Sequence, residues 1–287
     1  MNVAFTGGSG FVGKRFISYN QQKWNLVPIN LRQADLSQLN LDNIDAIVHL
    51  AGKAHQMTPI ADQVYFDVNY SLTKQLVERA IECNVPHFIY ISSTKVYGDD
   101  IAGILNEKSA CHPNDAYGES KLKAEQFLEQ LTEIKVAIVR PPLVYGPEVK
   151  GNMIKLLHLA NKRIPLPLGN INNARSMVFI DNLVELINTI ILKKALGIYI
   201  AGDEKPISSD GLIKLMRKYL NNHSMLISIP LFARSIIKKI KPALYVRLFG
   251  SYVIDNSSGN KALNFVPPFS TEYGVQKMVE WFKKQPK

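Results

Sequence analysis

Tyr117 and Lys121 stand four residues apart in the stretch AYGESKLKAEQF at 116–127. Residues at i and i+4 share one face of a helix and are separated by about 6 Å of rise. A positive charge beside a phenol favours the phenolate, and a phenol that exchanges its proton near neutral pH is a general acid/base. The same spacing also occurs on ordinary solvated helix faces, so its meaning depends on the rest of the chain.

A glycine-rich loop near the N-terminus is the second feature that could do chemistry. The stretch TGGSGFVG at 6–13 follows an apolar run at once and opens a helix-length segment. Gly7, Gly10 and Gly13 allow a tight turn, close approach of the backbone to a pyrophosphate and close packing of helix on strand. The helix start adds free N–H groups and the positive end of the helix dipole. In this strand, loop and helix context the pattern predicts a dinucleotide site rather than a turn without a ligand.

The residues after the second apolar run bear on the choice of dinucleotide. Asn30 stands where an acid would bind the ribose diol, and Arg32 follows two residues later. A neutral amide with a nearby guanidinium suits a 2′-phosphate, so NADP(H) is favoured and NAD(H) remains possible. Arg32 could equally be an ordinary exposed arginine. Asp35 either accepts from the adenine amine or caps the turn before Leu36.

Apolar runs and helix-length segments alternate along the chain and define the fold that positions these residues. Most of the runs are continuous, which is typical of strands buried on both faces, and they occupy 2–6, 26–30, 46–52, 87–93, 136–146 and 197–202. Between them lie helix-length segments such as 11–22, 67–83 and 115–132. This order predicts an α/β fold, a Rossmann-type doubly wound parallel sheet.

The expected domains are a dinucleotide-binding domain at 1–150 and a smaller C-terminal substrate-binding lobe at 151–287. Helix-like segments at 151–162, 181–193 and 209–220 belong to the second part, and 176–202 is expected to return to the first.

Composition limits the function classes. A chain of 287 residues with 46% hydrophobic and 20% charged content buries a sizeable core. It has no run of eighteen apolar residues and no charged leader before an apolar segment, so we expect a cytoplasmic protein. Cys83 and Cys111 have no metal-ligand spacing, so free thiols and no metal site are expected.

The net charge of +10 is concentrated in one region. Between Gly211 and Gly250 the chain has eight basic residues and no acidic one, interleaved with Leu, Ile, Phe and Met. This pattern fits peripheral association with an anionic membrane surface, or a helical subdomain with a solvated basic face. Nucleic acid is not expected as a partner, because the basic residues are not organised with stacking aromatics.

The ordered set of motifs resembles the extended short-chain dehydrogenase/reductases, the nucleotide-sugar epimerase, dehydratase and reductase group. Beside the glycine loop and YGESK at 117–121, the resemblance rests on VHLAG at 48–52, DVNYSLTKQLVERA at 67–80, ISSTKVYGD at 91–99, RPPLVYGP at 140–147, RSMVFIDNLV at 175–184 and FVPPFSTEYGVQKMVEWF at 265–282. It therefore covers nearly the whole chain.

The resemblance implies roles for individual residues. Tyr117 becomes the catalytic acid/base, Lys121 holds the nicotinamide ribose and lowers the pKa of Tyr117, and Ser93 hydrogen-bonds the reacting sugar oxygen. The implied cofactor contacts, beside Lys121, are Gly7, Gly10, Phe11, Val12, Gly13, Asn30, Arg32, Asp35, Leu36, Leu50, Ala51, Gly52 and Asn69. The implied substrate contacts are Ser93, Thr94, Asn152, Arg175 and Arg247.

Two departures from the family pattern narrow the chemistry. Sugar 4,6-dehydratases carry an Asp-Glu pair where this chain has Thr94 and Lys95, which removes the evident proton shuttle for elimination. Leu143 replaces the asparagine that 4-epimerases often use to hold the substrate phosphate.

The resemblance implies a UDP-sugar substrate and a homodimer. The expected activity is NADP(H)-dependent reduction at C4 of a UDP-4-keto-6-deoxy-N-acetylhexosamine in bacterial surface-polysaccharide (O-antigen type) synthesis. The alternatives are a UDP-glucose or UDP-N-acetylglucosamine 4-epimerase with tightly bound NAD, and a non-catalytic dinucleotide-binding regulator, which the fold alone does not exclude.

Overall fold

The computed structural model describes residues 1–31, 35–54, 60–99 and 103–285 and divides the chain into two compact units. Unit 1 comprises Met1–Pro142, Leu183–Ala201 and Asp255–Val266. Unit 2 comprises Leu143–Asn182, Gly202–Ile254 and Pro267–Lys287. The first break therefore falls at Pro142 rather than near residue 150, and residues 183–201 rather than the whole of 176–202 belong to unit 1.

A six-stranded sheet forms the centre of unit 1, with every adjacent pair of strands parallel. The strand order is β10-β6-β4-β3-β1-β2. These strands are β1 (Asn2–Thr6), β2 (Asn25–Ile29), β3 (Ala46–His49), β4 (His87–Ile91), β6 (Lys135–Arg140) and β10 (Gly197–Ile200). The chain moves from β1 to β2 on one side and then to β3 on the other, so the loop after β1 lies at a topological switch point, where such folds bind ligands.

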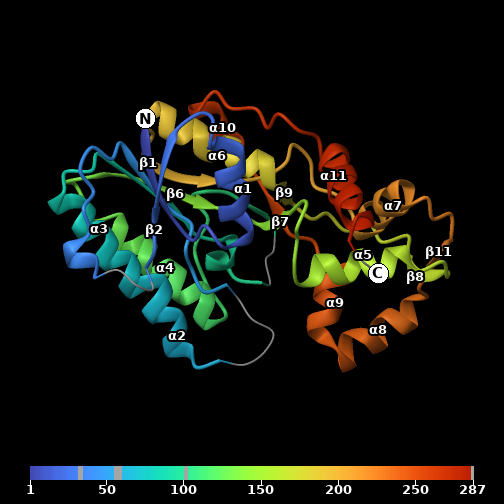
Figure 1. Ribbon diagram of the computed structural model, residues 1–287. Coiled ribbons are helices and arrows are strands. Elements are labelled where there is room, and N and C mark those ends of the chain that lie inside the picture. The colour runs from blue at the N-terminus through green and yellow to red at the C-terminus, as the bar shows by residue number, and fades with distance from the viewer. Residues whose placement is uncertain (32–34, 55–59, 100–102, 286–287) are drawn as a thin grey trace. The chain divides into compact units, whose positions relative to one another are not determined.

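Helices cover both faces of this sheet (Figure 1). The helices of unit 1 are α1 (Phe11–Asn20), α2 (Asp62–Phe66), α3 (Leu72–Glu82), α4 (Ala116–Leu128), most of α6 (Ile180–Lys193) and α10 (Ser257–Ala262). On one face α3 and α4 pack Leu76 and Leu128 against Ile47 and Phe88 in a single core cluster. On the other face Phe16 of α1 contacts Phe5 of β1. The predicted doubly wound α/β fold is confirmed.

Short elements complete unit 1. They are the 3₁₀ helices Leu36–Gln38 and Thr94–Tyr97, the π-helical segment Asp67–Ser71 directly before α3, and β5 (Ile104–Leu105). The apolar run at 136–146 does not form one strand, because Pro141 and Pro142 interrupt it and proline cannot donate to a sheet ladder. Its second half becomes β7 (Leu143–Tyr145), which belongs to unit 2.

Unit 2 is a smaller group of helices with two short strand pairs. Strand β7 pairs with β9 (Met177–Phe179), and β8 (Leu166–Gly169) pairs with β11 (Leu226–Ser228). The remaining elements are α5 (Asn152–Asn161), α7 (Ser209–Leu220), α8 (Leu231–Ile240), α9 (Pro242–Phe249), β12 (Val253–Ile254) and α11 (Thr271–Lys283). Its core is formed by buried residues of α5, α7 and α11, such as Leu157, Met216 and Met278.

No helix within the described ranges is long and apolar enough to cross a membrane.

Candidate active site

Ser93 and Tyr117 are brought together by the end of β4 and the start of α4. Ser93 leaves the strand in an extended conformation and caps the following 3₁₀ helix, since its Oγ accepts from the Lys95 N–H at 3.2 Å. Helix α4 begins because the Asp115 carboxylate accepts from the Gly118 N–H at 2.8 Å. Tyr117 thus lies in the first turn of α4, half-buried and hydrogen-bonded to the Ser93 side chain.

The pKa of the Tyr117 phenol is raised, which differs from the expectation that Lys121 lowers it. Burial is the main cause, the hydrogen bond with Ser93 acts in the opposite direction, and the charge of Asp115 raises the pKa further. Lys121, whose Nζ donates to the Ile91 carbonyl, does not contribute to this shift. The chain's own groups therefore keep Tyr117 protonated, and any lowering of its pKa needs a further positive charge at the site.

Lys121 is buried on the inner face of α4, with only 4% of its surface exposed. Its Nζ donates to the carbonyl oxygen of Ile91 at 2.8 Å and lies 4.6 Å from the centroid of the Tyr90 ring. Burial lowers the pKa of this ammonium to about 7, although the Glu125 carboxylate acts in the opposite direction. A lysine of this kind changes its charge easily near neutral pH.

The glycine loop after β1 is packed too closely to carry side chains. Gly7 has φ +71°, and a Cβ there would lie 2.6 Å from the backbone nitrogen of Ala51. A Cβ on Gly13 would collide with the backbone of Gly7 and Gly8. Phe11 and Val12 are half-buried in the first turn of α1, which contains no acid and has no side-chain cap at Gly10. The loop and the uncapped helix start therefore fit the diphosphate of a dinucleotide.

A chain of buried hydrogen bonds connects this loop to the segment after β3. The Ala51 N–H donates to Thr6 Oγ1 at 3.0 Å, and Thr6 Oγ1 lies 2.7 Å from His49 Nδ1. His49 Nε2 lies 2.9 Å from Thr73 Oγ1, whose hydroxyl donates to the Asn69 carbonyl. Burial, and then the charge of Lys121, lower the pKa of His49 to about 3, so the imidazole is neutral. This series of hydrogen bonds holds the half-buried residues Leu50 and Ala51 against the glycine loop.

Asn69 connects the segment after β3 to α4. Its side chain accepts from the Lys53 N–H at 2.8 Å and donates to the Lys53 carbonyl and to Ser120 Oγ. A Cβ on Gly52 would lie 3.1 Å from both Asn69 Oδ1 and Lys121 Nζ. Gly52, Asn69 and Lys121 therefore lie close together, and their contact with a cofactor stays a prediction.

The residues after β2 are only partly described. Asn30 is exposed at the end of that strand, and Leu36 is buried. Asp35 caps the 3₁₀ helix, because its carboxylate accepts from the Ser37 N–H at 3.1 Å and from the Ser37 hydroxyl at 2.7 Å. Asp35 thus caps the turn, and its contact with the adenine amine stays a prediction. Arg32 lies outside the described residues.

The predicted substrate contacts are divided between the units. Thr94 is buried in unit 1, and its N–H donates to the Pro141 carbonyl at 3.0 Å. Asn152 is exposed as the first residue of α5 in unit 2. Arg175, also in unit 2, donates from Nη1 to the carbonyls of Gly250 at 3.0 Å and Val246 at 3.3 Å, so it supports the end of α9. The side chain of Arg247 lies outside the described part of the structure.

The buried ion pair between Glu125 and Arg140, which lies one helical turn after Lys121, was not identified from the sequence. Glu125, one turn further along α4, is bound by Arg140 through Nε at 3.0 Å, and both side chains are buried. Arg140 Nη1 also donates to the Tyr97 hydroxyl at 2.7 Å. Although burial lowers the pKa of Arg140, the hydrogen bonds and charge of Glu125 outweigh that effect and raise it. The available signal was the acid at i+4 from Lys121 on the same helix face.

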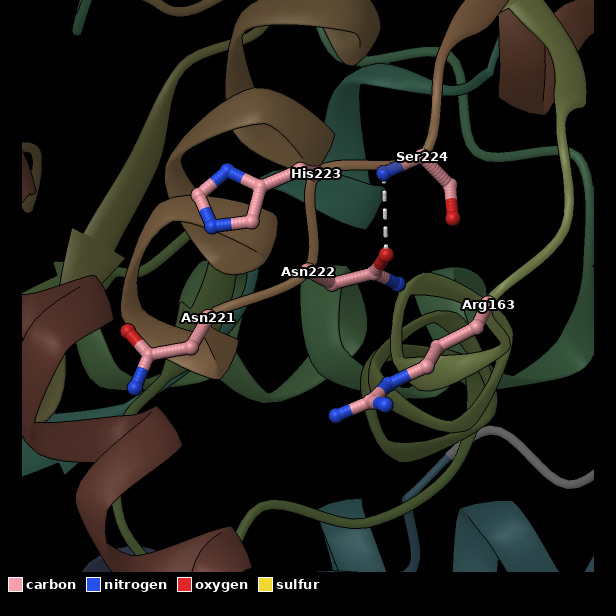
Figure 2. Close-up of a pocket in the computed structure, with 5 residues that line it drawn as sticks. All are labelled: Arg163, Asn221, Asn222, His223 and Ser224. Atoms are coloured by element: carbon pink, nitrogen blue, oxygen red, sulfur yellow. Dashed lines mark hydrogen bonds between the residues drawn. The ribbon is translucent and has the colours of Figure 1, made fainter.

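A pocket of about 450 Å³ lies at the C-terminal end of α7 and is lined by Arg163, Asn221, Asn222, His223 and Ser224. Figure 2 shows these five residues. Its lining lies entirely within unit 2 and includes none of the predicted site residues. In the described ranges of the chain, no group of three His, Cys, Asp or Glu side chains is placed to hold a metal ion.

Comparison with known proteins identifies the family. Residues 3–202 match the model of the NAD dependent epimerase/dehydratase family. The UDP-glucose 4-epimerase of Vibrio cholerae is 31% identical over 312 residues, covering 98% of this chain and 95% of that protein. The N-acetyl-alpha-D-glucosaminyl-diphospho-ditrans,octacis-undecaprenol 4-epimerase of Escherichia coli O157:H7 is 25% identical, covering 98% of this chain and 95% of that protein.

Solved structures agree on the fold. UDP-glucuronic acid 4-epimerase from Bacillus cereus in complex with NAD has a TM-score of 0.79 at 21% identity, with 99% of each chain covered. RMD from Pseudomonas aeruginosa complexed with NADPH has a TM-score of 0.80 at 20% identity, also with 99% of each chain covered. The chain therefore belongs to the NAD dependent epimerase/dehydratase family and is an enzyme of the extended short-chain dehydrogenase/reductase type.

Proposed function

We propose that the protein interconverts the C4 epimers of a nucleotide-diphosphate hexose, with UDP-glucose and UDP-N-acetylglucosamine as the first substrates to test. The observation that carries the proposal is the hydrogen bond between Tyr117 and Ser93, together with the buried ammonium of Lys121, which donates to the Ile91 carbonyl. Ser93 and Ile91 both lie at the carboxyl end of β4, in the same sheet as the glycine loop after β1. The 31% identity to a UDP-glucose 4-epimerase along 98% of the chain supports it.

Each of the three side chains has a distinct task in this proposal. Tyr117 removes the proton from the sugar 4-hydroxyl while hydride leaves C4, and it returns a proton to the 4-keto oxygen when hydride is delivered to the opposite face. Ser93 holds the same sugar oxygen through its hydroxyl. Lys121 binds the nicotinamide ribose, and the positive charge of the oxidised nicotinamide ring, when bound, would be the further charge that favours the phenolate of Tyr117.

The proposed cofactor is a nicotinamide dinucleotide, which supplies the hydride acceptor and donor at C4 of its ring. Gly7, Gly10 and Gly13 bring the backbone to the diphosphate, and the first turn of α1 provides N–H donors. Leu50, Ala51 and Gly52 border the same space. An epimerase returns the hydride to the sugar from which it was taken, so tightly held NAD suits this reaction.

The substrate contacts Thr94, Asn152, Arg175 and Arg247 are part of the proposal, as are the UDP group, a cytoplasmic location and a homodimer. For Arg175, diphosphate binding requires the guanidinium to share or exchange its present carbonyl acceptors. An arginine fork is well matched to phosphate geometry, which supports this assignment.

The experiment is a substrate panel without added cofactor. Purified protein is incubated separately with UDP-glucose, UDP-N-acetylglucosamine and a lipid-linked N-acetylglucosaminyl diphosphate, the type of compound that appears in the name of the E. coli relative. Formation of the galacto epimer, read by NMR or chromatography, supports the proposal. If no epimer forms while mass analysis shows that the protein retains NAD, the reading of a non-catalytic dinucleotide-binding regulator is favoured.

Net reduction at C4 of a UDP-4-keto-6-deoxy-N-acetylhexosamine by NADPH is the second candidate. It is favoured by Asn30, because β2 ends without the acid that would select the ribose diol of NAD. If Arg32 binds the 2′-phosphate, NADPH should bind at least about tenfold more tightly than NADH, a difference of about 1.4 kcal/mol. Titration by nicotinamide fluorescence measures this preference. If Arg32→Ala prefers NADPH over NADH as strongly as the wild type does, Arg32 does not bind the 2′-phosphate.

A further inference from the structure

Helix α8 of unit 2 turns large apolar side chains outward. Phe232, Ile236 and Ile240 recur every four residues and are 71%, 51% and 70% exposed. At 100° per residue they occupy an arc of about 80° on one side of the helix. Soluble surface helices normally turn such a stripe inward, so this face requires an explanation.

The opposite side of α8 is the side that packs against the protein. Arg234 and Ile237 are half-buried there. The Arg234 guanidinium donates to the carbonyls of Ile229 and Asn170 at 3.1 Å each and lies 5.3 Å from the centroid of the Phe249 ring in α9. Figure 1 shows α8 and α9 as consecutive helices of one hairpin. The helix is therefore held in an orientation that leaves Phe232, Ile236 and Ile240 facing solvent.

Six of the eight basic residues between Gly211 and Gly250 fall into two groups. Lys214 is paired with Asp210 and Lys218 with Glu272, both at 2.7 Å. Arg217 donates to the carbonyls of Ile164 and Met225. These three side chains are occupied within the protein.

Lys238, Lys239 and Lys241 form the second group. All three are exposed at the C-terminal end of α8, and within the described part of the chain none of them contacts a carboxylate. Lys238 lies 5.7 Å from the centroid of the Tyr245 ring, so its aliphatic stem follows the α8–α9 hairpin. The stretch from Gly211 to Gly250 has no acidic residue that could neutralise them.

We propose that the outward face of α8, formed by the apolar stripe of Phe232, Ile236 and Ile240 with Lys239 on its flank, docks on the surface of an anionic lipid bilayer, and that Lys238 and Lys241 add positive charge at the same end of the helix. The apolar stripe enters the boundary between headgroups and acyl chains, while the lysine stems extend so that their ammonium groups reach lipid phosphates. Charge complementarity selects this occupant, because an apolar stripe flanked by Lys239, on a helix that ends at three exposed lysines, suits anionic lipid, whereas a second copy of the same face would bring like charges together.

Vesicle flotation with the full chain tests the proposal, and it does not depend on which reaction the protein catalyses. Vesicles of phosphatidylcholine alone are compared with vesicles containing about 30% phosphatidylglycerol, at low and high salt. We expect binding to the anionic vesicles that falls more than about tenfold without the anionic lipid or at high salt. Equal partition into both vesicle types, or no flotation with either, would overturn the proposal.

Two variants locate the contact. In K238Q/K239Q/K241Q each lost charge is worth about fivefold in partition, so binding should fall about a hundredfold. In F232S/I236S/I240S binding should be lost at any lipid composition. The matched control is L192S/L196S/V266S, which removes three comparably exposed apolar side chains from unit 1 and should bind vesicles like the wild type.

Circular dichroism melting first establishes that all variants are folded. Wild-type binding by either α8 variant, or equal loss in the control, refutes the assignment of this face. A change from dimer to monomer in F232S/I236S/I240S with vesicle binding intact would assign the face to self-association instead.

Discussion

Replacing Lys121 by methionine should change how stability depends on pH. The pKa of this buried ammonium is lowered from 10.5 to about 7, chiefly by burial. A shift of about 3.5 units corresponds to a cost of roughly 5 kcal/mol for holding the charged form in the fold. Below pH 7 both folded and unfolded chains are protonated and this cost is present in full. Between pH 7 and 10.5 the unfolded chain binds the additional proton, so stability rises with pH.

The assay is urea unfolding of wild type and Lys121→Met at half-unit steps from pH 6 to 9. The wild type should gain about 2 kcal/mol relative to the variant between pH 7 and 9, because the slope approaches about 1.4 kcal/mol per pH unit. Lys123→Met is the matched control, since Lys123 lies on the same helix but is exposed, and its difference from wild type should not vary with pH. A constant difference for Lys121→Met would show that burial does not neutralise Lys121.

Three other substitutions test the site. Tyr117→Phe should reduce turnover at least about a hundredfold and leave dinucleotide affinity within a few-fold, and more than a tenth of the wild-type rate would be inconsistent with Tyr117 as the acid/base. Glu125→Gln leaves the charge of Arg140 buried and unpaired and should cost about 3–5 kcal/mol in urea unfolding; a loss below about 1 kcal/mol would contradict the buried pair. Gly7→Ala should abolish dinucleotide binding in calorimetry, whereas Gly151→Ala, with a similar φ of +66° but open space around its Cβ, should retain it.

The sheet and its glycine loop were predictable because they depend on local signals. Continuous apolar runs place the strands of unit 1, and the glycine spacing places the turn between β1 and α1. The division at Pro142 was less evident, since an apolar run that continues past two prolines resembles a single long strand until its pairing partners are known.

The proposed catalytic residues were predicted from their spacing and from family resemblance, whereas the direction of their pKa shifts was not. The effect of Lys121 on Tyr117 depends on where its Nζ points, and the carbonyl of Ile91 and the ring of Tyr90 come from a strand far away in sequence. The contribution of Glu125 and Arg140 depends on burial by the same long-range packing. The sequence also could not predict that α8 turns its apolar side toward solvent, because an amphipathic pattern does not show which side of the helix packs against the rest of the protein.

Transfer of the hydrogen at C4 tests the central claim most directly. UDP-glucose carrying deuterium at C4 is incubated with the protein in ordinary water without added cofactor, and the product is examined by NMR and mass spectrometry. The account predicts UDP-galactose with the deuterium still at C4, because the hydride returns to the carbon from which it was taken, and no product with Tyr117→Phe. Loss of deuterium from C4 to solvent, or reaction only when NADPH is supplied with a 4-keto sugar and consumed in equal amount, would contradict it.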